Sequence, residues 1–83
     1  MTIARTLTYN VSTVEKDSLK LLKTFVSHWL SGFCSGNYDI HLREDSIDYS
    51  KVYIDVDFSE DRDCLIAVLK DFPPELSKFR VIH

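Results

Sequence analysis

KVYIDVDF, residues 51–58, alternates between apolar and polar side chains over its whole length. Its even-numbered positions are all apolar, and its odd-numbered positions hold lysine, tyrosine and two aspartates. Because successive side chains of a strand point to opposite faces of its sheet, one face of this strand packs on a core while the other meets water. The stretch therefore predicts a strand in a sheet that is covered on one side only.

The sequence before this strand predicts two further strands and a helix. The same alternation is found in residues 3–11 and 38–43, which we expect to be strands. Between them lies a long amphipathic helix, expected to start at a capping box formed by Ser12 and Glu15 and to end near Gly32 or Gly36. Its apolar stripe follows a 3.6-residue period and comprises Leu19, Leu22, Phe25, Val26, Trp29 and Phe33.

A second helix is expected after residue 58, with Ser59 as its N-cap and Pro73-Pro74 at its end. Residues 76–82 then predict a short last strand. The polar segment 44–50 between the two middle strands fits either a β-bulge or a loop. The expected core stripe of the second helix comprises Cys64, Leu65, Val68, Leu69 and Phe72.

The resulting order of elements is β-α-β-β-α-β. With right-handed crossovers, this order predicts an α+β, ferredoxin-like two-layer sandwich, in which a four-stranded antiparallel sheet carries two helices on one face. Residues 1–83 are expected to form a single domain. The fold hosts many unrelated activities, so it leaves the function open.

Composition is typical of an ordinary globular protein of a reducing compartment. Hydrophobic residues make up 45% of the chain, and the longest uninterrupted apolar run, residues 64–69, is far shorter than a membrane span. The first residues lack the apolar core of a secretory signal. Two cysteines, Cys34 and Cys64, do not make a disulfide framework. We therefore expect reduced thiols, a cytoplasmic location and no membrane contact.

Acidic residues are concentrated in the second half of the chain. Between Glu44 and Asp63, eight acidic residues face two basic ones, a net charge of −6, whereas the whole chain carries −3. A negative surface repels nucleic-acid phosphates and attracts a basic protein groove. A structural role is the alternative, because acids in a first helical turn stabilise the helix dipole and open sheet faces are usually polar. The residues expected to bind a partner are Asp45, Asp48, Asp55, Asp57, Glu60, Asp61 and Asp63.

The main hypothesis is a small non-enzymatic protein without a cofactor that binds or inhibits a macromolecule through this acidic surface. The expected partner is a protein or a protein–nucleic acid complex with a basic groove, and the chain itself is expected to be a monomer or a homodimer. A nucleic-acid-mimicking inhibitor fits this description, for example a phage-type inhibitor of a host defence complex, of the anti-CRISPR kind.

Two alternatives come from other functional classes. Asp39 and His41 are expected to lie beside Asp55 and Asp57 on the uncovered face, where such groups could hold Mg²⁺ or Mn²⁺ in a nuclease or phosphodiesterase. Cross-strand ion pairs explain the same residues without a metal. The other alternative is a self-associating regulatory domain, with a contact that uses the sheet or the last strand at its edge.

Residues 51–58 also resemble the central strand of the RNA recognition motif at four positions: Lys51, Tyr53, Val56 and Phe58. The resemblance implies bases stacked on the uncovered face. The sequence departs from the motif at Asp55, where the second stacking aromatic would stand, and two aspartates there repel phosphates. Direct binding of nucleic acid is therefore not expected.

Nucleophilic catalysis is not expected either. Cys34 follows the C-terminal end of the first helix, where the helix dipole raises the pKa of a thiol. Cys64 is expected in the core, where thiols are inert. His28 borders the apolar face of its helix and is expected to pack there.

Overall fold

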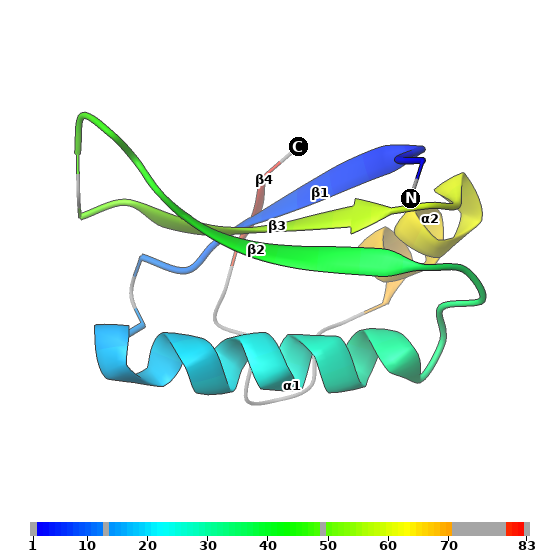
Figure 1. The fold of residues 1–83 in the computed structure, drawn as a ribbon, viewed down its shortest axis with the longest axis horizontal. Helices are drawn as coiled ribbons and strands as arrows, with labels where there is room; N and C mark the ends of the chain where they lie inside the picture. The colour runs from blue at the N-terminus through cyan, green and yellow to red at the C-terminus, as the bar shows by residue number, and fades with distance from the viewer. Residues whose placement is uncertain (1, 13, 49, 71–79, 83) are drawn as a thin grey trace.

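Two helices and an antiparallel sheet make up the described part of the chain. The computed structural model describes residues 2–12, 14–48, 50–70 and 80–82, the last three by their backbone alone. α1 runs along one face of the sheet (Figure 1). The elements, in chain order, are β1 (Arg5–Asn10), a 3₁₀ turn η1 (Lys16–Ser18), α1 (Leu19–Ser31), β2 (Tyr38–Glu44), β3 (Val52–Phe58), α2 (Asp61–Leu69) and β4 (Arg80–Ile82). The α+β class is confirmed.

The strands are arranged in the order β2-β3-β1-β4. β3 is central and pairs antiparallel with both long neighbours, so that Val56 lies opposite Leu7 on β1 and Ile40 on β2. The short β4 pairs antiparallel with β1. This arrangement is compatible with a ferredoxin-like sandwich, and it places β2 and β4 at the two edges.

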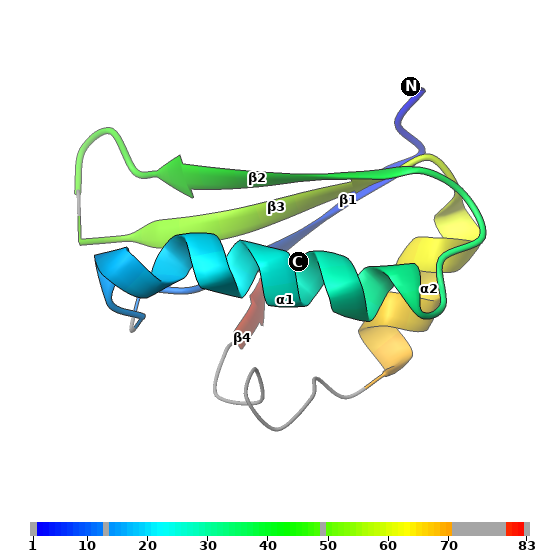
Figure 2. The same cartoon turned by 60° about the horizontal axis from the view of Figure 1, so that its bottom comes forward.

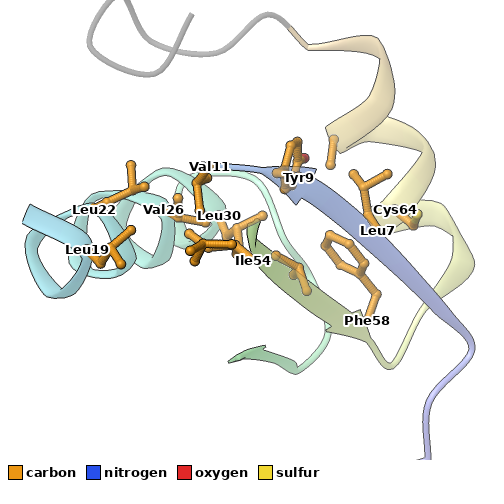
Figure 3. Packing of buried hydrophobic residues seen from close by; sticks show 13 residues of the cluster. Leu7, Tyr9, Val11, Leu19, Leu22, Val26, Leu30, Ile54, Phe58 and Cys64 are labelled. Carbon is orange, nitrogen blue, oxygen red and sulfur yellow. The ribbon is translucent and has the colours of Figure 1, made fainter. Parts of the chain in front are cut away.

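β3 alternates between buried and half-buried side chains along its whole length, as its sequence predicts. Its even-numbered side chains belong to a single hydrophobic cluster with residues of β1 and of both helices (Figure 3). Both helices therefore cover the same face of the sheet, and the odd-numbered side chains of β3 lie on the other face. The helix residues buried in this cluster are Leu19, Leu22, Val26 and Leu30 from α1 and Cys64 and Ala67 from α2.

The predicted capping box is wrong. Ser12 continues the end of β1: its Oγ accepts a hydrogen bond from the Val52 amide at 3.0 Å and donates one to Asn10 Oδ1 at 2.6 Å. Glu15 precedes η1 without a capping hydrogen bond from its side chain, and α1 begins only at Leu19. A serine side chain can bond to backbone groups in turns as well as at helix N-termini, and Ser12 does so at the end of β1 instead of capping α1. The end of α1 at Gly32 agrees with the prediction.

The predicted core stripe of α2 is also wrong in part. Cys64 is buried, but Leu65, Val68 and Leu69 are 51%, 42% and 84% exposed. The buried face consists of Asp63, Cys64 and Ala67. Ser59 does not cap this helix through its side chain; instead its Oγ accepts a hydrogen bond from the Asn37 amide at 2.8 Å. The predictions that concern Phe72, Pro73-Pro74 and residues 76–79 lie outside the described residues.

No helix within the described ranges is both long enough and apolar enough to cross a lipid bilayer.

Candidate functional site

The face of the sheet opposite α1 and α2 is the candidate functional site. In the described part of the chain no helix covers it (Figure 1). Because side chains alternate along a strand, this face takes the even positions of β1 and the odd positions of β2 and β3. Its residues are Thr6, Thr8, Asn10, Asp39, His41, Arg43, Tyr53, Asp55 and Asp57.

Arg43 and Asp55 form an ion pair on this uncovered face. Arg43 Nε donates to Asp55 Oδ2 at 2.7 Å and Nη2 donates to Oδ1 at 3.2 Å, which makes a two-pronged contact. Thr8 Oγ1 donates a third hydrogen bond to Asp55 Oδ1 at 2.8 Å. The Arg43 guanidinium holds the pKa of this carboxyl below its usual range, against the opposing effect of partial burial. The same guanidinium lies 4.7 Å from the centre of the Tyr53 ring.

Asp57, two residues further along β3, is held in a similar way. Thr6 Oγ1 donates to its Oδ1 at 2.6 Å, and His41 Nε2 lies 3.2 Å from its Oδ2. Both contacts from β2 are diagonal, because His41 lies directly opposite Asp55 and Arg43 directly opposite Tyr53. Asp55 and Asp57 are therefore not the bare carboxylates that a purely acidic docking surface requires.

Asp39 differs from the other carboxylates on this face. It lies opposite Asp57, is exposed, and makes no hydrogen bond or ion pair with the described part of the chain.

Asp45 and Asp48 stabilise the connection between β2 and β3, which is a loop. Asp45 Oδ1 accepts hydrogen bonds from the amides of Ile47 and Asp48, at 2.8 and 3.2 Å. Asp48 Oδ1 accepts from the amide and the hydroxyl of Ser50. These bonds lower the pKa of both carboxyls. Both side chains have a local structural role, although their residues still reach solvent.

Glu60 and Asp61 lie at the start of α2. Asp61 forms an ion pair with Arg5 of β1, and both side chains are about half exposed. Glu60 is exposed. Since the loop that carries Asp45 and the start of α2 lie at opposite ends of β3, a seven-residue strand, the two groups are roughly 20 Å apart. The predicted acidic residues therefore do not form one continuous patch.

Asp63 does not belong to any surface, so its place in the predicted partner-binding set is wrong. Its side chain is fully buried. Burial alone would raise the pKa of this carboxyl, but hydrogen bonds from the Gly36 amide at 2.8 Å and from the Ser35 amide and hydroxyl hold it below its usual range. A Cβ atom on Gly36 would lie 2.7 Å from Ser59 Oγ and from Glu60 Cγ, so a larger residue in this turn would have to displace the side chains just before α2. Asp63 thus connects α2 to the turn between α1 and β2.

The metal-binding alternative gains no support from the geometry of the described residues, and the two cysteines and His28 were not expected to be catalytic. The described residues contain no group of three or more histidine, cysteine or acidic side chains that could hold a metal ion. Burial, with a smaller effect from Asp63, raises the pKa of the Cys34 thiol to about 11. Burial also raises the pKa of Cys64. His28, which was expected to pack, is exposed.

Sequence reasoning placed Asp39 and His41 beside Asp55 and Asp57 and considered cross-strand ion pairs there, but it missed the contacts that Tyr53 and Thr8 make with the Arg43–Asp55 pair. The only signal for them is the strand register, which brings together residues far apart in the chain. Comparison with protein-family models, with curated proteins and with solved structures finds no match.

Proposed function

We propose that this chain is a small non-enzymatic binding protein and that the uncovered face of the sheet contacts its partner. The observation that carries the proposal is the cluster of Arg43, Tyr53, Asp55 and Thr8 on that face. Arginine and tyrosine are the residue types that most often contribute the binding energy of protein interfaces. Their positions are held before any partner arrives, which lowers the entropy lost on binding.

The full ferredoxin-like sandwich is part of this proposal. The strand order β2-β3-β1-β4, the antiparallel pairing of all neighbours and the shared hydrophobic cluster of both helices support it. In such a sandwich the second face of the sheet stays free for binding.

The chemistry of the contacts favours a protein partner of mixed charge. The narrower proposal, a nucleic-acid-mimicking inhibitor of a phage type, needs several bare carboxylates on one surface. Arg43, His41 and Arg5 lie against three of the predicted acids, and a fourth is buried. The narrower form rests on the net charge of −3, on the exposed residues Asp39, Asp48 and Glu60, and on the half-buried Asp45.

Affinity capture from native lysate tests the proposal. The immobilised chain should retain a specific protein, and the double substitution Arg43→Ala and Tyr53→Ala should abolish that retention. Lys20→Ala with Lys23→Ala on the exposed side of α1 is the matched control and should retain the partner. Equal retention by all three proteins would exclude this face. Loss of capture on Asp39→Lys with Glu60→Lys, but not on the Arg43 and Tyr53 changes, would favour the acidic form instead.

A further inference from the structure

β2 leaves a free edge along the sheet. It is the outermost strand in the order β2-β3-β1-β4, and nothing in the described part of the chain pairs with its outer side (Figure 2). Its seven residues, YDIHLRE, include no proline or glycine that would interrupt pairing. Soluble proteins usually protect an edge of this length, because its unpaired backbone groups bind other strands.

The register fixes which backbone groups point outward. The Asp45 amide donates to the Lys51 carbonyl, and the Ser59 amide donates to the Asn37 carbonyl. The odd-numbered residues of β2 are therefore those that bond to β3. The amides and carbonyls of the even-numbered residues point to the free edge: Tyr38, Ile40, Leu42 and Glu44.

The side chains of β2 are complementary to those of a second, antiparallel β2. When two copies meet about a two-fold axis at His41, Asp39 of each copy lies opposite Arg43 of the other. Ile40 of each then lies opposite Leu42 of the other on the helix-covered face. This register also matches the backbone, because its hydrogen-bonded pairs consist of even-numbered residues only.

The two residues of the charged pair are free to meet. Asp39 has no partner within the described residues of its own chain. Asp55 accepts hydrogen bonds from Nε and Nη2 of Arg43, and the guanidinium carries further N–H donors that can reach Asp39 of a second copy. Leu42, at 37% exposure, would lose solvent contact in the pair.

The neighbouring registers fit less well. A two-residue slip in one direction puts Asp39 opposite Asp45 of the other copy and His41 opposite Arg43. A slip in the other direction leaves Arg43 opposite Asn37. Since like charges directly opposite each other destabilise a sheet and opposite charges stabilise it, the register about His41 is favoured, because it alone of the three pairs Arg43 of each copy with a carboxylate, that of Asp39.

We propose that the partner of this edge is a second copy of the chain, joined through β2 in the register about His41. The two sheets then form one continuous antiparallel sheet, and the uncovered faces of both copies lie side by side. This inference goes beyond the proposed binding function and does not depend on it.

Sedimentation velocity of the full chain over a range of concentrations tests the pairing. The wild type should form a dimer, and Leu42→Pro should shift the equilibrium to monomer by at least about tenfold in dissociation constant, because proline removes an amide that points outward. The amide of Leu42 takes no part in the β2–β3 ladder, so the fold should persist, as circular dichroism will show. Leu69→Ser is the control: it changes the most exposed leucine of α2, away from the edge of β2, and should leave the dimer intact.

A charge swap tests the register independently of proline. Asp39→Lys places a lysine opposite Arg43 at both of the symmetry-related positions, and this variant should be monomeric. Arg43→Glu combined with Asp55→Lys reverses the ion pair within the chain and should also yield monomer. An equimolar mixture of these two variants should form a heterodimer, because each charge then meets its opposite across the edge.

Three results would overturn the proposal. One is a wild type that stays monomeric up to millimolar concentration. Another is a folded Leu42→Pro variant that dimerises as the wild type does, or a dimer lost on Leu69→Ser, either of which places the contact elsewhere. The third is a mixture of the charge variants that stays monomeric. In each case the capture experiment with Arg43→Ala and Tyr53→Ala still decides the binding function separately.

Discussion

Among the acidic residues of this chain, Asp63 has the clearest structural role. It is fully buried and accepts hydrogen bonds from Ser35 and Gly36. Replacement by asparagine puts an NH₂ group against one of these donors. Asp63→Asn should therefore lower the free energy of unfolding at pH 7 by about 1.5–3 kcal/mol, as measured by urea denaturation. A change below 0.5 kcal/mol would contradict the anchoring role.

The same residue makes stability depend on pH. Because the folded-state pKa of Asp63 is lowered, its contribution is fully present above the ordinary carboxyl pKa of about 3.9 and is lost as the pH falls through the folded value. The difference in unfolding free energy between the wild type and Asp63→Asn should accordingly narrow between about pH 5 and pH 2. A difference that stays constant over that range would assign the effect to packing.

Cys34 should react slowly with thiol reagents. Its pKa of about 11 leaves very little thiolate at pH 7.4. We expect labelling by a disulfide reagent to be roughly a hundredfold slower than for a free thiol, and to accelerate as the pH rises toward 11. Cys34→Ser leaves only the buried Cys64 and should remove the faster phase of labelling. Rapid labelling of Cys34 at neutral pH would show a reactive thiol.

At the scale of single elements, β3 carries the core. Ile54 is 1% exposed, whereas Ile47 in the β2–β3 loop is 93% exposed. Ile54→Ala should cost about 2–5 kcal/mol of unfolding free energy, and the same substitution at Ile47 should cost less than about 0.5 kcal/mol. Chemical denaturation of the two variants under identical conditions measures the difference. Equal effects would mean that β3 is not the centre of the core.

The elements differ in how well their sequences predict them. β3 was predictable because each of its even positions is apolar and only one face of the sheet is covered. α2 was harder: with nine residues and apolar side chains on several sides, its sequence does not reveal which side is buried. The burial of Asp63 rotates the helix so that Leu65 and Leu69 face outward. That burial depends on Ser35 and Gly36, more than twenty residues away in the chain.

The candidate site was predictable in part for a similar reason. Alternation alone places Asp55 and Asp57 on the uncovered face. The sequence also placed Asp39 and His41 beside them, as the register with β2 shows. Whether each carboxylate is bare or paired depends on side-chain contacts such as Arg43–Asp55, which the local sequence allows but does not require. The preference for bare carboxylates made the expected surface acidic, whereas the contacts make it mixed.

At the scale of the whole molecule, the charges of this chain are distributed rather than concentrated. The acidic segment 44–63 covers β3 and the loops at both of its ends. Arg43 and His41 of β2 lie against the carboxylates of β3, and Arg5 of β1 lies against Asp61 at the start of α2. The summed charge of the segment therefore overstates the field that a partner meets at any one place. A sheet face of mixed charge, together with the edge of β2 that no described residue pairs with, describes the molecule better than a single negative face.

The dimer through β2 predicts a stability that depends on protein concentration. When folded dimers unfold to single chains, mass action favours the dimer as concentration rises. For a chain of this size, each tenfold rise should increase the thermal midpoint by about 3–5 °C. Leu42→Pro should remove this dependence, because it removes the pairing edge while keeping the core. Differential scanning calorimetry of both proteins over two decades of concentration makes the comparison, and a wild-type midpoint that does not move with concentration would show that the folded unit is a single chain.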